Sequence, residues 1–137
     1  MATTILIADD ERSLRRLVSV GLAVGDYRIL EARDGEEAWR LLRAERPAVA
    51  LLDVQMPART GLELTQAIRR DDDLAGTRVV LLSAKAQPAD VAAGLAAGAD
   101  RYLTKPFSLA ELLAVVRNEL AMTAPGIGAA PPGGGEV

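Results

Sequence analysis

Residues 49–57 read Val-Ala-Leu-Leu-Asp-Val-Gln-Met-Pro, and this stretch predicts both the fold and the place of its chemistry. It begins as an uninterrupted apolar run, which is typical of a strand buried on both faces of a parallel sheet. The run ends in Asp53, and a loop from Pro57 to Gly61 follows. In open parallel sheets, ligands bind outside the carboxyl ends of the strands. We therefore expect chemistry at Asp53, although a lone aspartate in this place more often only caps a turn.

The ends of three other apolar runs strengthen the functional interpretation of Asp53. Residues 5–8 are followed by Asp9 and Asp10, residues 79–82 by Ser83, and residues 101–104 by Lys105 and Pro106. If these strands are parallel, all these groups meet at one edge of the sheet. The remaining strand candidate, Tyr27 to Ala32, ends in no comparable group, as suits a strand at the margin.

Strand-like and helix-like segments alternate five times along the chain, which predicts an α/β fold with helices on both faces of a parallel sheet. The first helix is expected from about Glu11 to Val24. Its expected inner face comprises Leu14, Leu17, Val18 and Leu22.

The fourth helix, expected at about residues 88–97, differs from the others. Val91 and Leu95 are its only large apolar anchors, and Gly94 costs about 1 kcal/mol relative to alanine in a helix. We expect this helix to be the least firmly held, which is typical of elements that take part in switching.

Composition limits the possible functions. The 137 residues suffice for one domain with a real core, which must be aliphatic because only 3% of residues are aromatic. The net charge of −3 gives no electrostatic reason to expect nucleic-acid binding, and the absence of cysteine excludes thiol chemistry. No apolar run reaches membrane-spanning length and no signal peptide precedes the first strand, so a cytoplasmic protein is expected.

From residue 123 onward the chain becomes rich in glycine, proline and alanine. Such a segment buries too little apolar surface to hold a fold. We expect residues 1–122 to form the domain and residues 123–137 to be a disordered tail or linker stub. The protein is then either a stand-alone domain or the N-terminal part of a longer protein.

At this point the chain resembles a known family, the receiver domain of two-component response regulators (the CheY-like superfamily), over about residues 3–122. The resemblance rests on Asp9-Asp10, on Asp53 with Met56-Pro57 and Gly61, on Ser83-Ala84, and on Lys105-Pro106. It implies a doubly wound, flavodoxin-like sheet of five parallel strands in the order 2-1-3-4-5, with five helices. It also implies that the Lys105-Pro106 peptide is cis.

The chemistry of these groups fits a phosphoacceptor. A carboxylate such as that of Asp53 can accept a phosphoryl group as an acyl phosphate, and catalysis is then mainly positioning and electrostatic stabilisation. Clustered acids need a hard cation, so Asp9, Asp10 and Asp53 are candidate Mg²⁺ ligands. Lys105 and Ser83 can contact phosphate oxygens, and Lys105 is one of only two lysines beside fourteen arginines. Asp10 is also expected to cap the first helix.

Further roles come from the resemblance alone. It implies that the backbone carbonyl of Gln55 is a further metal ligand. It places the side chains of Gln55 and Lys85 beside the phosphoryl group, where they would tune dephosphorylation. It also implies that Tyr102 is an aromatic switch residue, which turns from an exposed position to a buried one. It implies a histidine kinase or phosphotransfer protein as phosphodonor. The surface of the fourth helix, fifth strand and fifth helix would carry the output to a partner or a second copy.

Two other function classes fit the sequence less well. A metal-dependent phosphatase with an aspartyl nucleophile typically has a second acid two residues after the nucleophile, where this chain has Gln55, and a cap for which there is no room. A flavin or nucleotide carrier lacks support because there is no glycine-rich phosphate loop and little aromatic content. The preferred interpretation is a regulatory phosphoacceptor that catalyses only its own phosphorylation and dephosphorylation.

Overall fold

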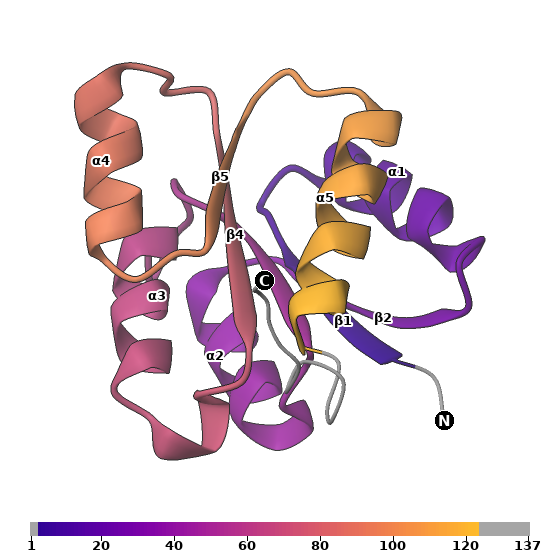
Figure 1. Ribbon diagram of the computed structural model, residues 1–137, viewed down its shortest axis with the longest axis horizontal. Helices are drawn as coiled ribbons and strands as arrows, with labels where there is room; N and C mark the ends of the chain where they lie inside the picture. Colours follow the sequence, from indigo (N-terminus) through magenta and orange to yellow (C-terminus); the bar gives the residue numbers. More distant parts are fainter. Residues whose placement is uncertain (1–2, 124–137) are drawn as a thin grey trace, which may run out of the picture.

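A computed structural model describes residues 3–123, and its strands form one parallel sheet in the order β2-β1-β3-β4-β5 (Figure 1). The strands are β1 (Thr3–Ala8), β2 (Tyr27–Ala32), β3 (Val49–Asp53), β4 (Arg78–Ser83) and β5 (Arg101–Thr104). The predicted fold class and strand order are confirmed. The order places β1 beside β3 and β3 beside β4, so the groups at their carboxyl ends are neighbours.

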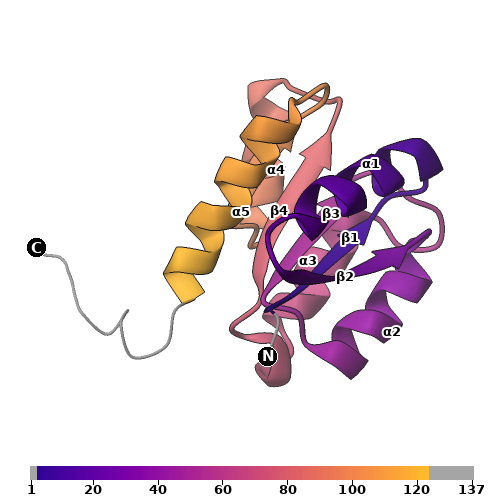
Figure 2. The ribbon, with the colours of Figure 1, turned by 90° about the vertical axis from the view of Figure 1, so that its right-hand side faces the viewer.

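Residues 3–123 contain five α-helices and one short 3₁₀ helix, of which all but the last α-helix connect successive strands. They are α1 (Arg12–Ala23), α2 (Gly35–Glu45), α3 (Gly61–Arg69), η1 (Asp72–Leu74), α4 (Pro88–Ala96) and α5 (Leu109–Thr123). Helices α1 and α5 cover one face of the sheet, and the other helices cover the opposite face (Figure 2). Within the described part of the chain, no helix is long and apolar enough to cross a membrane.

The expected boundary at residue 122 falls within α5, which runs to Thr123. The rest of the predicted tail, from residue 124 onward, lies outside the described residues.

The central strands are apolar without interruption because both faces of the sheet are covered. Successive side chains of a strand point to opposite faces. Leu6 and Leu52 thus pack in the cluster that includes α2 and α3, whereas Ile7 and Leu51 pack in the cluster that includes α1 and α5. All four side chains are fully buried.

Helix α1 packs with a slightly different face from the one predicted. Val18 and Leu22 are buried as expected, but Leu17 is 58% exposed. The buried stripe passes instead through Arg15, which is only 7% exposed. Hydrophobicity alone could not identify this rotation of the helix, because the stripe contains a charged residue with polar partners at the sheet edge.

Helix α4 rests on the sheet through a glycine. Gly94 is its buried residue, whereas Leu95, predicted as an anchor, is 47% exposed. A Cβ at Gly94 would lie 2.8 Å from Cδ2 of Tyr102 and 2.9 Å from Cδ1 of Leu81. The helix therefore approaches β4 and β5 closely while burying little of its own apolar surface, in agreement with the predicted weak attachment.

The loop after β3 contains a strained turn. Ala58 has φ +72°, and the N–H of Arg59 donates to the carbonyl of Pro57 at 2.8 Å. An i to i+2 hydrogen bond around a residue of positive φ is the γ-turn that proteins seldom use, because an L side chain is strained there.

The turn yields a stability prediction. Ala58→Gly is expected to raise the free energy of unfolding by about 1 kcal/mol, because glycine adopts positive φ without a steric penalty. Urea unfolding of the variant measures the change. Ala92→Gly, in the exposed interior of α4, is the control and should lower stability by about 1 kcal/mol. If Ala58→Gly were destabilising as well, the turn would not be strained.

Candidate functional site

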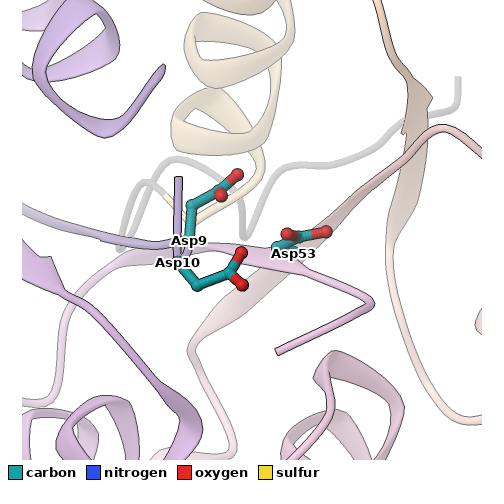
Figure 3. A group of neighbouring side chains, drawn as sticks. All are labelled: Asp9, Asp10 and Asp53. Atoms are coloured by element: carbon teal, nitrogen blue, oxygen red, sulfur yellow. The ribbon is translucent and has the colours of Figure 1, made fainter. Parts of the chain in front are cut away.

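Three carboxylates meet at the carboxyl edge of the sheet. Asp9 and Asp10 directly follow β1, and Asp53 is the last residue of β3. One carboxylate oxygen from each residue lies within 4.8 Å of the others (Figure 3). Asp9 and Asp53 are buried, whereas Asp10 is exposed at the mouth of the cluster. The three candidate ligands predicted from separate strand ends are thus brought together.

Lys105 supplies the positive charge of the site. Its Nζ lies 2.8 Å from Oδ2 of Asp9 and 3.5 Å from Oδ2 of Asp53. Its own N–H donates to the carbonyl of Ser83 at 2.7 Å, and the Lys105-Pro106 peptide is cis, as the resemblance implied. Burial opposes the charged form, but the hydrogen bond that Lys105 donates to Asp9 and the charges of both acids outweigh it and raise the pKa of Lys105.

The electrostatics of the cluster favour a cation. Burial, together with the negative charge of Asp9, raises the pKa of Asp53 to about 6, although Lys105 acts in the opposite direction. Lys105 therefore does not offset the combined effect of burial and of Asp9 on Asp53. Three carboxylates with converging oxygens are the hard ligands that a divalent cation such as Mg²⁺ prefers. The residues present fit such an ion.

The loop of residues 54–60 is fixed at both ends next to Asp53. The N–H of Val54 donates to the carbonyl of Leu82 at 2.9 Å, and the N–H of Gly61 donates to the carbonyl of Val54 at 3.0 Å. A Cβ at Gly61 would lie 2.5 Å from the carbonyl oxygen of Asp53, so the close return of the loop requires glycine. Gln55 is exposed on this loop, and its N–H donates to Oδ1 of Asp53 at 3.3 Å.

A chain of hydrogen bonds runs from Ser83 to Tyr102 through the backbone of Lys85. Ser83 is buried, and its Oγ accepts from the N–H of Lys85 at 3.0 Å. The carbonyl of Lys85 accepts from the hydroxyl of Tyr102 at 2.7 Å. The Tyr102 ring is half-buried under Gly94, so the exposed starting position predicted for it is wrong. Because Gly94 has no Cβ, there is room beneath it for the Tyr102 ring.

The expected capping role of Asp10 is also wrong. The N–H of Glu11 donates to Oδ1 of Asp9 at 2.8 Å, and α1 begins after Glu11 without a side-chain cap on its first turn. Asp9 is thus held by Glu11 on one oxygen and by Lys105 on the other, whereas Asp10 is exposed at the mouth of the cluster. Of the two roles expected for Asp10, only that of a candidate metal ligand remains.

Sequence reasoning missed Arg15. Its Nη1 donates to the carbonyl of Asp9 at 2.8 Å, and its Nε pairs with Glu31 of β2 at 3.0 Å. The sequence did contain an indication of this contact, because Arg15, Val18 and Leu22 recur at helical spacing on one face of the helix. An arginine in an apolar stripe needs a polar partner. The contact fixes the backbone from which Asp9 projects.

A cleft of about 370 Å³ borders the site beside Lys105. It is lined by Glu11, Leu14, Ala84, Lys105, Pro106 and Phe107. The cleft leaves one side of the lysine open to an approaching molecule.

A flavodoxin-like domain with acids, a lysine and a hydroxyl at one sheet edge has the architecture of a regulatory receiver domain. The chain belongs to the response regulator receiver domain family, whose model matches residues 5–117. It is therefore a receiver domain of the response regulators of two-component systems.

Named relatives agree with this membership. The chain is 38% identical over 128 residues to the phosphate regulon transcriptional regulatory protein PhoB of Pseudomonas aeruginosa, covering 93% of this chain and 56% of that protein. It is 42% identical over 130 residues to the response regulator MprA of Mycolicibacterium vanbaalenii, covering 94% and 55%. The chain spans about half the length of these curated relatives.

Solved structures show the same fold. The chemotaxis response regulator CheY4 of Vibrio cholerae superimposes with a TM-score of 0.82 at 32% identity, covering 87% of this chain and 99% of that one. The receiver domain of the Francisella response regulator 1452 gives 0.83 at 30% identity, covering 89% and 99%. The alternative function, a metal-dependent phosphatase with an aspartyl nucleophile, is not favoured.

Proposed function

We propose that this domain is a phosphoacceptor switch in which Asp53 receives a phosphoryl group from a histidine kinase or phosphotransfer protein. The observation that carries the proposal is the convergence of three carboxylates within 4.8 Å, with Lys105 2.8 Å from one of them and 3.5 Å from Asp53. The regulatory role follows from family membership. The transfer chemistry rests on the geometry of the site.

In the proposed reaction an oxygen of Asp53 attacks the phosphorus of the donor. A P–O bond forms as the bond between phosphorus and the leaving group breaks, and the leaving acetate or imidazole departs with its electron pair. Lys105 neutralises a phosphate oxygen, and Ser83 donates a hydrogen bond to another. Asp9 holds the lysine in place through the 2.8 Å contact.

We propose Mg²⁺ as the cation of the site. Asp9, Asp10, Asp53 and the carbonyl of Gln55 would hold it, and it would supply positive charge to the transferring phosphoryl group. The converging oxygens of the three acids support this assignment, and so does the raised pKa of Asp53, which burial and the charge of Asp9 keep above its ordinary value despite Lys105.

Incubation with acetyl phosphate and Mg²⁺ tests the function. The expected result is one phosphoryl group per protein, visible as a mass shift, that requires Mg²⁺. A phosphatase would instead turn over an added phosphomonoester without retaining phosphate. Failure to take up phosphate under any Mg²⁺ concentration would contradict the phosphoacceptor proposal.

Gln55 and Lys85 are proposed to tune the lifetime of the phosphorylated state. Both side chains are exposed on loops that begin beside Asp53 and Ser83. Gln55→Ala and Lys85→Ala are expected to change the dephosphorylation rate severalfold while the unfolding midpoint stays nearly constant, because neither side chain is in the core. Loss of the mass shift over time measures the rate. Unchanged rates in both variants would show that these residues do not flank the phosphate.

The signal is proposed to leave the site through the backbone of Lys85, which links Ser83 to Tyr102. Phosphate on Asp53 offers Ser83 a charged partner, and such hydrogen bonds contribute about 1.5–3 kcal/mol. Movement of Ser83 shifts Lys85, whose carbonyl holds the Tyr102 hydroxyl. The surface of α4, β5 and α5 then changes, because Gly94 of α4 lies directly against the Tyr102 ring.

Ser83→Ala tests this coupling. The variant should still be phosphorylated on Asp53 but should lose the response, because alanine can neither contact phosphate nor accept from Lys85. The measurement is amide hydrogen exchange over residues 84–107, with and without beryllofluoride, in both proteins. Equal exchange with and without beryllofluoride in the wild type would place the switch elsewhere.

Three further proposals concern the output partner of the domain, its location in the cell and the extent of the functional unit. We propose that the α4-β5-α5 surface binds an output partner or a second copy of the chain, and that the protein acts in the cytoplasm with its kinase. We also propose that residues 1–122 are the functional unit, whether it works alone or within a longer regulator of the length of PhoB or MprA.

A further inference from the structure

We propose that Arg59 and the first turn of α2 position the loop that carries the metal-binding carbonyl of Gln55. The inference rests on the proposed function, because it assigns positioning residues to the same site. We call residues 54–60, between β3 and α3, the acceptor loop. Its ends are fixed beside Asp53, but the middle of the loop has contacts of a different kind.

The middle of the acceptor loop is held by α2. The carbonyl of Pro57 accepts two hydrogen bonds, one from the N–H of Arg59 within the loop and one from the N–H of Gly35 at 3.1 Å. Gly35 is the first residue of α2 and is buried against Arg59. A Cβ at position 35 would lie 2.6 Å from the Arg59 nitrogen and would overlap its carbonyl oxygen. Only glycine allows the loop and the helix to meet this closely.

The side chain of Arg59 adds a second attachment to the same helix. Its guanidinium carbon lies 5.2 Å from the ring centroid of Trp39, within the range of a cation–π interaction. Its Nε lies 3.5 Å from Oε2 of Glu36. The backbone and side chain of one loop residue thus both contact the first two turns of α2.

The strained turn at Ala58 shows why the attachment matters. A residue held at positive φ persists only where its surroundings fix the conformation. The residues on either side of Ala58 are those tied to α2: Pro57 by Gly35, and Arg59 by Trp39 and Glu36. The contacts with α2 therefore keep the acceptor loop in this shape, and Gln55 lies two residues before Pro57 on the same loop.

Arg59 would act through the loop and not by touching the phosphoryl group, so it is a positioning residue. Groups that orient metal ligands from outside the coordination shell commonly change metal affinity when they are removed. Loosening the loop should therefore weaken the Mg²⁺ affinity of the site more than it weakens the fold.

The test compares Arg59→Met with Arg43→Met. Arg43 is a matched control because its guanidinium carbon lies 5.7 Å from the same Trp39 ring, but it belongs to α2 and pairs with Asp71 instead of reaching the acceptor loop. The Mg²⁺ dissociation constant is measured by calorimetry. The rate of phosphorylation by acetyl phosphate is measured as a function of Mg²⁺ concentration.

Arg59→Met is expected to raise the Mg²⁺ dissociation constant by roughly tenfold. It should slow phosphorylation at low Mg²⁺ and recover the wild-type maximal rate at saturating Mg²⁺. Arg43→Met should stay close to wild type in both measurements. Unchanged Mg²⁺ affinity in Arg59→Met would overturn the inference, and so would an equal loss in both variants, which would assign the effect to Trp39 packing. A wild-type protein that binds no Mg²⁺ would overturn the proposed function as well.

Discussion

Asp53→Asn is expected to abolish phosphorylation by acetyl phosphate in the presence of Mg²⁺. The amide is nearly isosteric with the carboxylate, so the buried end of β3 keeps its packing, but an amide is not a nucleophile for phosphorus. The other acids of the cluster cannot replace it. Asp9 has one oxygen on Glu11 and the other on Lys105, and Asp10 lies at the exposed mouth.

Mass spectrometry of the intact protein measures this loss. Asp26→Asn is the matched control, since Asp26 is exposed, lies in the turn between α1 and β2, and has a positive φ that asparagine tolerates. The control should be labelled like the wild type. Undiminished labelling of Asp53→Asn would show that another residue is the acceptor.

The strand ends and their convergence could be predicted from the sequence because a strand buried on both faces is an uninterrupted apolar run that ends at a polar residue. A run such as residues 49–52 has no polar member until Asp53, and the same holds for residues 5–8 before Asp9. Parallel pairing then requires the ends to meet. Neither step depends on which side chain contacts which.

The side-chain contacts could not be predicted in the same way. Helix α1 offers apolar residues on more than one face, and its rotation is decided by the carbonyl of Asp9 and by Glu31, which Arg15 contacts. The inward position of Tyr102 depends on the absence of a Cβ at Gly94, on another element. Likewise, the link between Trp39 and the acceptor loop needs Arg59, which is twenty residues away. Each of these three contacts depends on how different elements pack against one another, which the local sequence pattern does not show.

The acid cluster predicts a pH-dependent gain of stability in Asp53→Asn when no metal is present. The pKa of Asp53 is about 6 in the folded protein, against an ordinary value of 3.8. Between these values the native state holds a proton that the unfolded chain releases, so the wild-type protein loses stability as pH rises through this window. Asparagine carries no charge and avoids this loss. At 1.36 kcal/mol per pKa unit, the variant should be more stable by about 2–3 kcal/mol at about pH 8 and no more stable at about pH 4.

Urea unfolding in the presence of a chelator measures the two stabilities. Asp26→Asn should show no such pH-dependent gain, because Asp26 lies outside the cluster. A gain in Asp53→Asn that persisted undiminished at about pH 4 would mean that the variant acts through packing and not through charge. Added Mg²⁺ should narrow the difference at about pH 8, because an ion that binds only the folded protein stabilises it and the wild type keeps all three carboxylates to bind it. The instability of the unliganded protein and the affinity of the site for a cation would then have a shared origin, the buried position of the Asp53 carboxylate beside Asp9 at the end of the sheet.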